Sequence, residues 1–258
     1  MLFWLVLGWV VWRIGRQHLD WRWLWFGLLI MWLAPLTKVI ALLAIPFFAI
    51  ASWRVLPTWR DRLILAFVTA MSYAASAVLI FLPFGSVATY IARLANEATG
   101  GVSFSPVAMV ILATRALGYS FNFGGIGPYL LVGLALVAFV LGILTWWPGR
   151  NPERGAADLL FAYTVQAFNF RLWYTTWLFP FLLLDGIYDE PNLSQERRLQ
   201  FGLWFLLGGQ LVVFFFSHGW HLFGRDHLWT HVLGVPFVFV LPFILVWCTQ
   251  RWFSTIRK

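Results

Sequence analysis

The sequence predicts an all-α protein, a polytopic transmembrane helix bundle. Apolar residues make up 61% of the 258-residue chain and charged residues 11%, whereas about a quarter of a soluble globular protein is charged. The mean hydropathy is +0.79. Apolar runs recur along the whole chain, and arginine-containing segments separate many of them. These observations argue against a soluble protein and indicate that residues 1–258 form a single transmembrane domain.

About nine apolar runs are candidate spans, some of them short or broken. A straight helical crossing needs about 20 residues, so the boundaries of the shorter runs are loosely defined. Pro35 and Lys38 interrupt the second and third runs, which form either a tight hairpin or one long broken helix. We favour the hairpin because it preserves the alternation of the loops. The candidate spans are residues 1–12, 23–36, 38–53, 63–84, 128–147, 157–168, 172–187, 201–217 and 232–250.

The basic residues predict the orientation of the chain. Of its 18 lysines and arginines, 13 fall in alternate connections and the C-terminal tail, at 13–22, 54–62, 148–156, 188–200 and 251–258. Cytoplasmic loops carry the excess of basic residues, so we place these segments inside. Nine crossings then put the N-terminus outside. The expected protein is a multi-pass protein of the inner (plasma) membrane with a cytoplasmic C-terminus.

The net charge of +8 and the pI of about 10.3 would suggest nucleic acid binding in a soluble protein. In a membrane protein, cytoplasmic arginines and attraction to anionic lipid explain the same charge. We therefore expect the membrane, and no nucleic acid, as a partner. The single cysteine, Cys248, excludes an internal disulfide.

The longest connection, residues 85–127, is expected to be an outer interfacial segment with two short amphipathic helices. Ser105 followed by Pro106 is a typical helix start. Gly100-Gly101 and the FNFGGIGP run at 121–128 are expected to interrupt helices.

Residues 166–185 carry the main candidate site. The run QAFNFRLWYTTWLFPFLLLD places Asn169, Arg171 and Tyr174 between two apolar stretches. An arginine there must reach the interface or a wet cavity, and Trp and Tyr prefer the headgroup level. We predict a helix rising to the outer surface, a polar turn and a descending helix. Arg171 is then either an interfacial anchor or a bidentate phosphate ligand.

The remaining outer basic residues are weighed in the same way. Lys38 opens an apolar run and is either a snorkelling anchor or a phosphate contact. Arg115 lies within an apolar helix, where snorkelling also explains it. His221 and Arg225 belong to SHGWHLFGRDHLWTH at 217–231, for which we favour a polar lid over an outer cavity.

Histidines and acidic residues are further candidates for a functional site. His227 and His231 have a spacing that could hold a metal on a helix, but no HExxH motif is present. We predict no metal site and no cofactor, and a divalent metal stays open as an alternative. Asp158 is expected to face a helix N-terminus, and Asp185 to be solvated in a cytoplasmic loop.

Two segments resemble bacterial GT-C glycosyltransferases, which are polytopic enzymes that use polyprenyl-phosphate sugars. FNFRLWYTTWLFPFLL is similar to their WY-x-x-W-x-x-P segment. APLTKVIALLAIPFFAIASW resembles their helix in which a lysine, here Lys38, precedes a proline, here Pro46. The resemblance implies a mannosyltransferase-like enzyme that takes a sugar from a polyprenyl-phosphate donor at the outer face. It implies donor contacts by Lys38 and Arg171.

The chain departs from that family in its acidic residues. GT-C enzymes carry an Asp or a D-D/D-E pair in their first outer loop, and this chain has no such pair at an outer position. The catalytic residue is therefore unknown, and we expect the N-terminal part of the parent fold to lie upstream of Met1. The alternatives are a non-catalytic membrane protein that binds lipid phosphate, and a transporter or lipid flippase, in which broken helices also occur.

Overall fold

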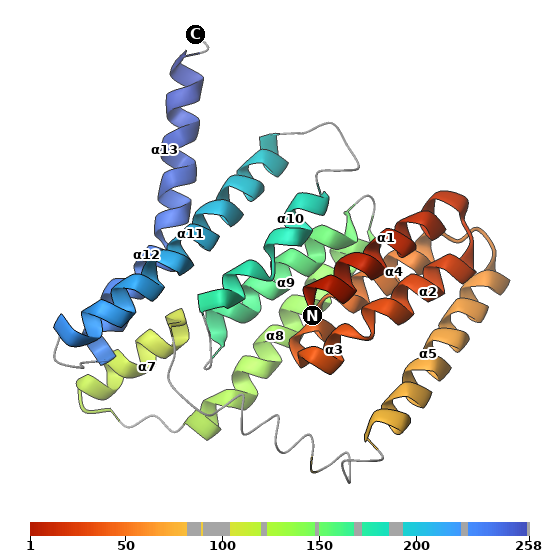
Figure 1. Ribbon diagram of the computed structural model, residues 1–258, viewed down its shortest axis with the longest axis horizontal. Coiled ribbons are helices and arrows are strands. Elements are labelled where there is room, and N and C mark those ends of the chain that lie inside the picture. Colours follow the sequence, from red (N-terminus) through yellow and green to blue (C-terminus); the bar gives the residue numbers. More distant parts are fainter. Residues whose placement is uncertain are drawn as a thin grey trace. The chain divides into compact units, whose positions relative to one another are not determined.

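The computed structural model describes residues 1–81, 89, 104–119, 123–147, 150–167, 172–185, 193–222 and 227–256. These residues are helical or form short connections, and no strand occurs among them (Figure 1). The all-α prediction is confirmed for this part of the chain. The helices are α1 Leu2–His18, α2 Trp21–Met31, α3 Ala34–Thr37, η1 Val39–Leu43, α4 Ile45–Val55, α5 Trp59–Phe81, α7 Pro106–Ala116, α8 Phe123–Trp146, α9 Pro152–Gln166, η3 Leu172–Thr176, α10 Phe179–Asp185, α11 Leu193–Leu222, α12 His227–Phe239 and α13 Leu241–Ile256.

The chain divides into two compact units. Unit 1 comprises Met1–Ala95 and Leu136–Leu159, and unit 2 comprises Asn96–Ala135 and Leu160–Lys258. Helices α8 and α9 each contribute to both units.

In unit 1, α1 and α2 form an antiparallel hairpin with backbones in close approach. A Cβ atom on Gly27 would lie 2.6 Å from the backbone nitrogen of Trp12, and one on Gly15 would lie 2.5 Å from that of Leu24. Small residues permit such close packing between membrane helices. Leu19, in the left-handed conformation, ends α1, and the Asp20 carboxylate accepts a hydrogen bond from the backbone of α2.

The chain reverses between α2 and α4. Trp12 packs against Gly27 of α2, and its indole donates a 2.7 Å hydrogen bond to Ser52 of α4. In one continuous helix Gly27 and Ser52 would be roughly 37 Å apart. The reversal agrees with the hairpin interpretation and excludes one long broken helix. It consists of α3, Lys38 and η1.

The other helices of unit 1 continue this alternation. Hydrogen bonds join Trp25 to Ser72 and Trp32 to Ser76. The residue numbers increase in the same direction along α2 and α5, so these two helices are parallel. Ile50 lies opposite Gly142, and Arg54 bonds the carbonyl of Thr145, so α4 is parallel to α8. Helix α5 follows α2 along the outside of this unit (Figure 1).

Unit 2 is held by aromatic side chains and close helix contacts. Phe161 of α9 packs edge-on against Phe201 and Phe205 of α11, and Phe205 in turn contacts Phe239 of α12. Helices α11 and α12 approach closely, because a Cβ on Gly208 would lie 2.8 Å from the carbonyl oxygen of Phe237.

Three helical stretches among the described residues are long and apolar enough to cross a membrane. They are Trp59–Leu79, Gly127–Trp146 and Leu228–Thr249, with mean hydropathies of 1.7, 2.4 and 2.4. Most of their residues are not buried within the chain, as expected when lipid covers them. The three helices fit a membrane protein, but they do not establish nine crossings.

Several predicted boundaries are wrong. Helix α1 extends to His18 and α11 begins at Leu193, inside expected loops, because the residues there include good helix formers such as Gln, Glu and Arg. Residues 123–128 of the expected breaker lie within α8. A helix in apolar surroundings must satisfy its backbone internally, which favours helix despite these glycines. Residues 121–122 lie outside the described part.

Candidate functional site

The predicted site residues fall into three groups. Asn169, Arg171 and Arg225 lie outside the described residues, and His221 is in α11 but its side chain is not described. Lys38 belongs to unit 1, whereas Tyr174 and Arg115 belong to unit 2. The convergence of Lys38 and Arg171 on one phosphate therefore stays a prediction.

Lys38 occupies the centre of the reversal between α2 and α4. Its backbone is extended (φ −159°, ψ 116°) between α3 and η1. Its N–H donates to the Ala34 carbonyl at 3.0 Å, and its carbonyl accepts from the Ala41 N–H at 3.1 Å. The side chain is half-buried, whereas Leu36 and Val39 are exposed. A cation thus stands at the end of the hairpin beside exposed apolar side chains.

The end of unit 1 that carries Lys38 is opposite to its arginine-bearing end. Helix α2 begins next to Arg22 and runs to Met31, and the chain returns through α4 to Arg54. The guanidinium of Arg54 donates to the carbonyl of Thr145 at 2.7 Å, in the last turn of α8. The contact satisfies a carbonyl that lacks an intrahelical partner and complements the helix dipole.

Tyr174 is in a different setting from the predicted surface turn. It lies in the short helix η3 with 6% of its surface exposed, and its ring stacks on Trp177 at a centroid distance of 3.7 Å. Trp177 is also buried and lies parallel to Tyr163 of α9. Within 172–185, the expected descending helix is η3 followed by the seven-residue α10. Pro180 near the start of α10 is compatible with a new helix there.

Arg115 is exposed in the last turn of α7. The expected start of this helix is confirmed, because the Ser105 hydroxyl accepts a hydrogen bond from the backbone of Ala108. Helix α7 packs on α12. Phe104, two residues before α7, stacks on His231 of α12 with 4.5 Å between the ring centroids. The other predicted helix of the outer segment lies outside the described residues.

The predicted histidine lid is largely helical where it is described. Residues up to Leu222 belong to α11, and α12 begins at His227. His231 is 1% exposed and stacks on Phe104, so it packs in a helix interface rather than in a loop. The fragment 223–226 lies outside the described residues.

Sequence reasoning missed a buried carboxylate in unit 1. Glu153, in the first turn of α9, has no exposed surface, and its Oε1 accepts a 2.5 Å hydrogen bond from the indole of Trp9. The guanidinium of Arg13 lies 5.3 Å from the centroid of the same Trp9 ring. The only available signal was a Glu directly after Pro152, which is typical of a helix start.

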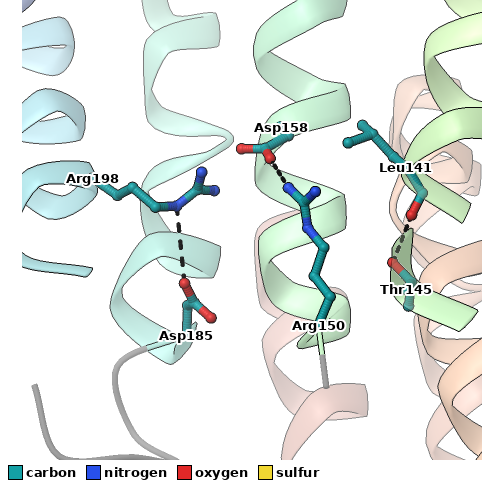
Figure 2. A network of polar contacts seen from close by, with 6 residues as sticks. All are labelled: Leu141, Thr145, Arg150, Asp158, Asp185 and Arg198. Carbon is teal, nitrogen blue, oxygen red and sulfur yellow. Dashed lines mark hydrogen bonds and ion pairs between the residues drawn. The ribbon is translucent and has the colours of Figure 1, made fainter. Parts of the chain in front are cut away.

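Two further carboxylates are paired where solvation or a helix start was expected (Figure 2). Asp158 lies in the interior of α9 and forms an ion pair with Arg150, so it does not cap the helix. Asp185, 2% exposed at the end of α10, faces Arg198 of α11 with 3.9 Å between Oδ2 and Nε. The Gln195 amide also donates to the Asp185 carbonyl at 3.3 Å. Each carboxylate is therefore paired with an arginine of its own unit, Asp158 in unit 1 and Asp185 in unit 2.

Among the described residues, no group of three His, Cys, Asp or Glu side chains could hold a metal ion. Comparison of the chain with models of protein families, with curated proteins and with solved structures finds no match.

Proposed function

We propose that this membrane protein binds a polyprenyl phosphate at the outer face, and that it supplies the lipid-phosphate site of a GT-C-like glycosyltransferase that uses a polyprenyl-phosphate sugar. The observation that supports this most is the position of Lys38. It lies in an extended break between two short helices, at the end of unit 1 opposite Arg22 and Arg54. A lipid phosphate needs a cation at the membrane surface next to apolar surface for its tail, and exposed Leu36 and Val39 adjoin Lys38.

The alternation of helices in unit 1 supports the proposed topology of nine crossings. The α1–α2 reversal, the α2–α4 reversal and the parallel pairs α2–α5 and α4–α8 agree with successive crossings in opposite directions. Under the positive-inside rule, the arginine-bearing end of unit 1 is cytoplasmic. Lys38 then faces outward, and we propose the inner membrane with a cytoplasmic C-terminus.

The proposed chemistry assigns charge stabilisation to the basic residues. The Lys38 ammonium would stabilise the negative charge of the departing lipid phosphate. Arg171, if it reaches the same phosphate, would add a bidentate contact. A carboxylate would have to activate the acceptor hydroxyl as general base, and we assign this role to no residue.

Binding of undecaprenyl phosphate to the purified 258-residue chain tests the lipid-phosphate site. Charge-assisted contacts contribute about 1.5–3 kcal/mol each, so Lys38→Gln or Arg171→Gln should weaken binding roughly ten- to a hundredfold. Arg171→Lys should recover only part of the loss because it lacks the guanidinium fork. Arg197→Gln removes an exposed charge from α11 in unit 2 and should leave binding unchanged. Unaltered affinity in both Gln variants would refute the site.

A transfer assay separates the enzyme from a non-catalytic lipid-phosphate-binding protein. Because the sequence has no Asp-Asp or Asp-Glu pair at a proposed outer position, we expect the 258-residue chain alone to bind the lipid without transferring sugar. Transfer from a polyprenyl-phosphate mannose by the purified chain would show that its own carboxylates suffice. Asp226 and Glu97 would then be the first residues to replace.

A further inference from the structure

The turn between α4 and α5 gathers cations and indoles on one surface of unit 1. Arg54 and Arg60 are exposed, and Arg62 is half-buried. The guanidinium of Arg62 lies 5.5 Å from the centroid of the Trp59 ring, and its Nε donates to the Leu56 carbonyl at 2.9 Å. We call Trp53, Arg54, Trp59, Arg60 and Arg62 the turn surface.

The turn surface is locally ordered and keeps a net positive charge. The Trp53 and Trp59 rings meet edge-to-face at 5.6 Å. Asp61 is the one carboxylate within residues 53–62, and it is engaged by Thr58: the hydroxyl lies 2.7 Å from Oδ2, and the Asp61 N–H donates to the hydroxyl at 3.1 Å. This reciprocal capping fixes the start of α5. Three arginines against one engaged carboxylate leave an excess of two positive charges.

An exposed apolar stripe places this surface at the membrane boundary. Trp59, Leu63, Phe67 and Met71 are spaced four residues apart on α5. Their exposed fractions are 65, 59, 67 and 55%, in that order. Such a stripe belongs in hydrocarbon, and tryptophan prefers the headgroup level. Trp59 at the foot of the stripe therefore sets the headgroup level, with Arg60 next to it.

We propose that the turn surface binds the headgroup phosphates of anionic phospholipids. The lipid tail would lie along the stripe on α5, and its phosphate would meet the guanidinium groups of Arg54, Arg60 and Arg62. The guanidinium groups of Arg54 and Arg62 each donate one hydrogen bond to a backbone carbonyl. A guanidinium has five N–H donors, so donors remain for phosphate. This site differs from the proposed polyprenyl-phosphate site because Lys38 lies at the opposite end of unit 1.

Native mass spectrometry of the purified 258-residue chain tests the proposal. The chain is titrated in detergent with dioleoyl-phosphatidylglycerol or with dioleoyl-phosphatidylcholine. We expect the wild-type chain to bind phosphatidylglycerol preferentially. A basic residue near an anionic lipid surface contributes about fivefold in affinity. Arg60→Gln should thus weaken phosphatidylglycerol binding about fivefold, and the Arg54→Gln/Arg60→Gln double variant about twenty-fivefold.

Three controls make the result decisive. Arg197→Gln removes an equal charge from an exposed position on α11 in unit 2 and should change binding less than twofold. Lys38→Gln should leave phosphatidylglycerol binding intact, which separates this proposal from the polyprenyl-phosphate site. Inorganic phosphate at 10 mM should not displace the lipid. Exposed Arg60 forms no hydrogen bond or ion pair with the residues that the structure describes, so Arg60→Gln tests the proposal even if the double variant is unstable.

Equal binding of the two lipids, or equal losses in Arg60→Gln and Arg197→Gln, would overturn the proposal. Displacement by inorganic phosphate would also overturn it, because the site would then recognise a free anion rather than a lipid. Wild-type phosphatidylglycerol binding by Arg60→Gln, together with weakened binding by Lys38→Gln, would place the phosphatidylglycerol site at the other end of unit 1 and would overturn the proposal.

Discussion

At the scale of single residues, unit 1 is tied together by tryptophan indoles that bond across helices. Trp12, Trp25 and Trp32 each donate to a serine hydroxyl on another helix, at 2.7, 3.1 and 2.6 Å. Trp9 donates to the carboxylate of Glu153. Serine can accept these bonds while its own hydroxyl donates to its helix backbone, as Ser52 does to Phe48. Each pair satisfies two polar groups inside an otherwise apolar bundle.

We expect the Trp9–Glu153 contact to contribute more to stability than its serine counterparts. Hydrogen bonds to charged groups contribute about 1.5–3 kcal/mol, and neutral ones about 0.5–1.5 kcal/mol. A double-mutant cycle of Trp9→Phe with Glu153→Leu should give the larger coupling energy, and a cycle of Trp25→Phe with Ser72→Ala the smaller. Unfolding in mixed SDS micelles measures both, and the cycle cancels the loss of ring volume. Equal coupling energies would show that the Glu153 carboxylate stabilises its indole contact no more than a serine hydroxyl does.

At the scale of helices, the existence of the apolar segments could be predicted, but their ends and partners could not. Hydropathy located α5 and α8 well, and the Ser105-Pro106 start signal was sufficient for α7. The ends of α1 and α11 were missed because arginine and glutamate favour both loops and helices. The pairing of Asp185 with Arg198 depends on tertiary contacts that no local pattern encodes. The break between α2 and α4 was indicated by Pro35 and Lys38, whereas its short helices were not.

The α1–α2 hairpin depends on glycine, and this can be tested by adding one methyl group. In Gly27→Ala the new Cβ would lie 2.6–2.7 Å from backbone atoms of Trp12, so the two helices must separate. Overpacking of this kind costs about 1–3 kcal/mol. Gly133→Ala in α8 is the matched control, because nothing lies within 4 Å of its Cβ, and it should stabilise the helix by about 0.5–1 kcal/mol. Unfolding free energies of the two variants should therefore shift in opposite directions, and a stabilised Gly27→Ala would exclude close packing.

At the scale of the whole molecule, the predicted site residues are divided between the two compact units. Lys38 belongs to unit 1, and Tyr174 and Arg115 belong to unit 2. Sequence could nominate these residues because a cation among apolar residues needs an explanation in a membrane. It could not determine their distances, which depend on how distant segments pack. Unit 1 does have two distinct ends, with Lys38 at one end and Arg22 and Arg54 at the other.

These two ends yield a topology prediction for the intact protein. Gln17, near the end of α1, and Thr37, next to Lys38, are both exposed and lie at opposite ends of unit 1. If the arginine-bearing end is cytoplasmic, Thr37→Cys should react with a membrane-impermeant maleimide in intact bacterial cells, and Gln17→Cys should react only after lysis. Both substitutions are made in a Cys248→Ser background, because Cys248 is the only native cysteine and is exposed. Labelling of Gln17→Cys alone in intact cells would invert the orientation and place Lys38 inside, away from an outer-face donor. Labelling of both in intact cells would contradict the membrane-crossing hairpin itself.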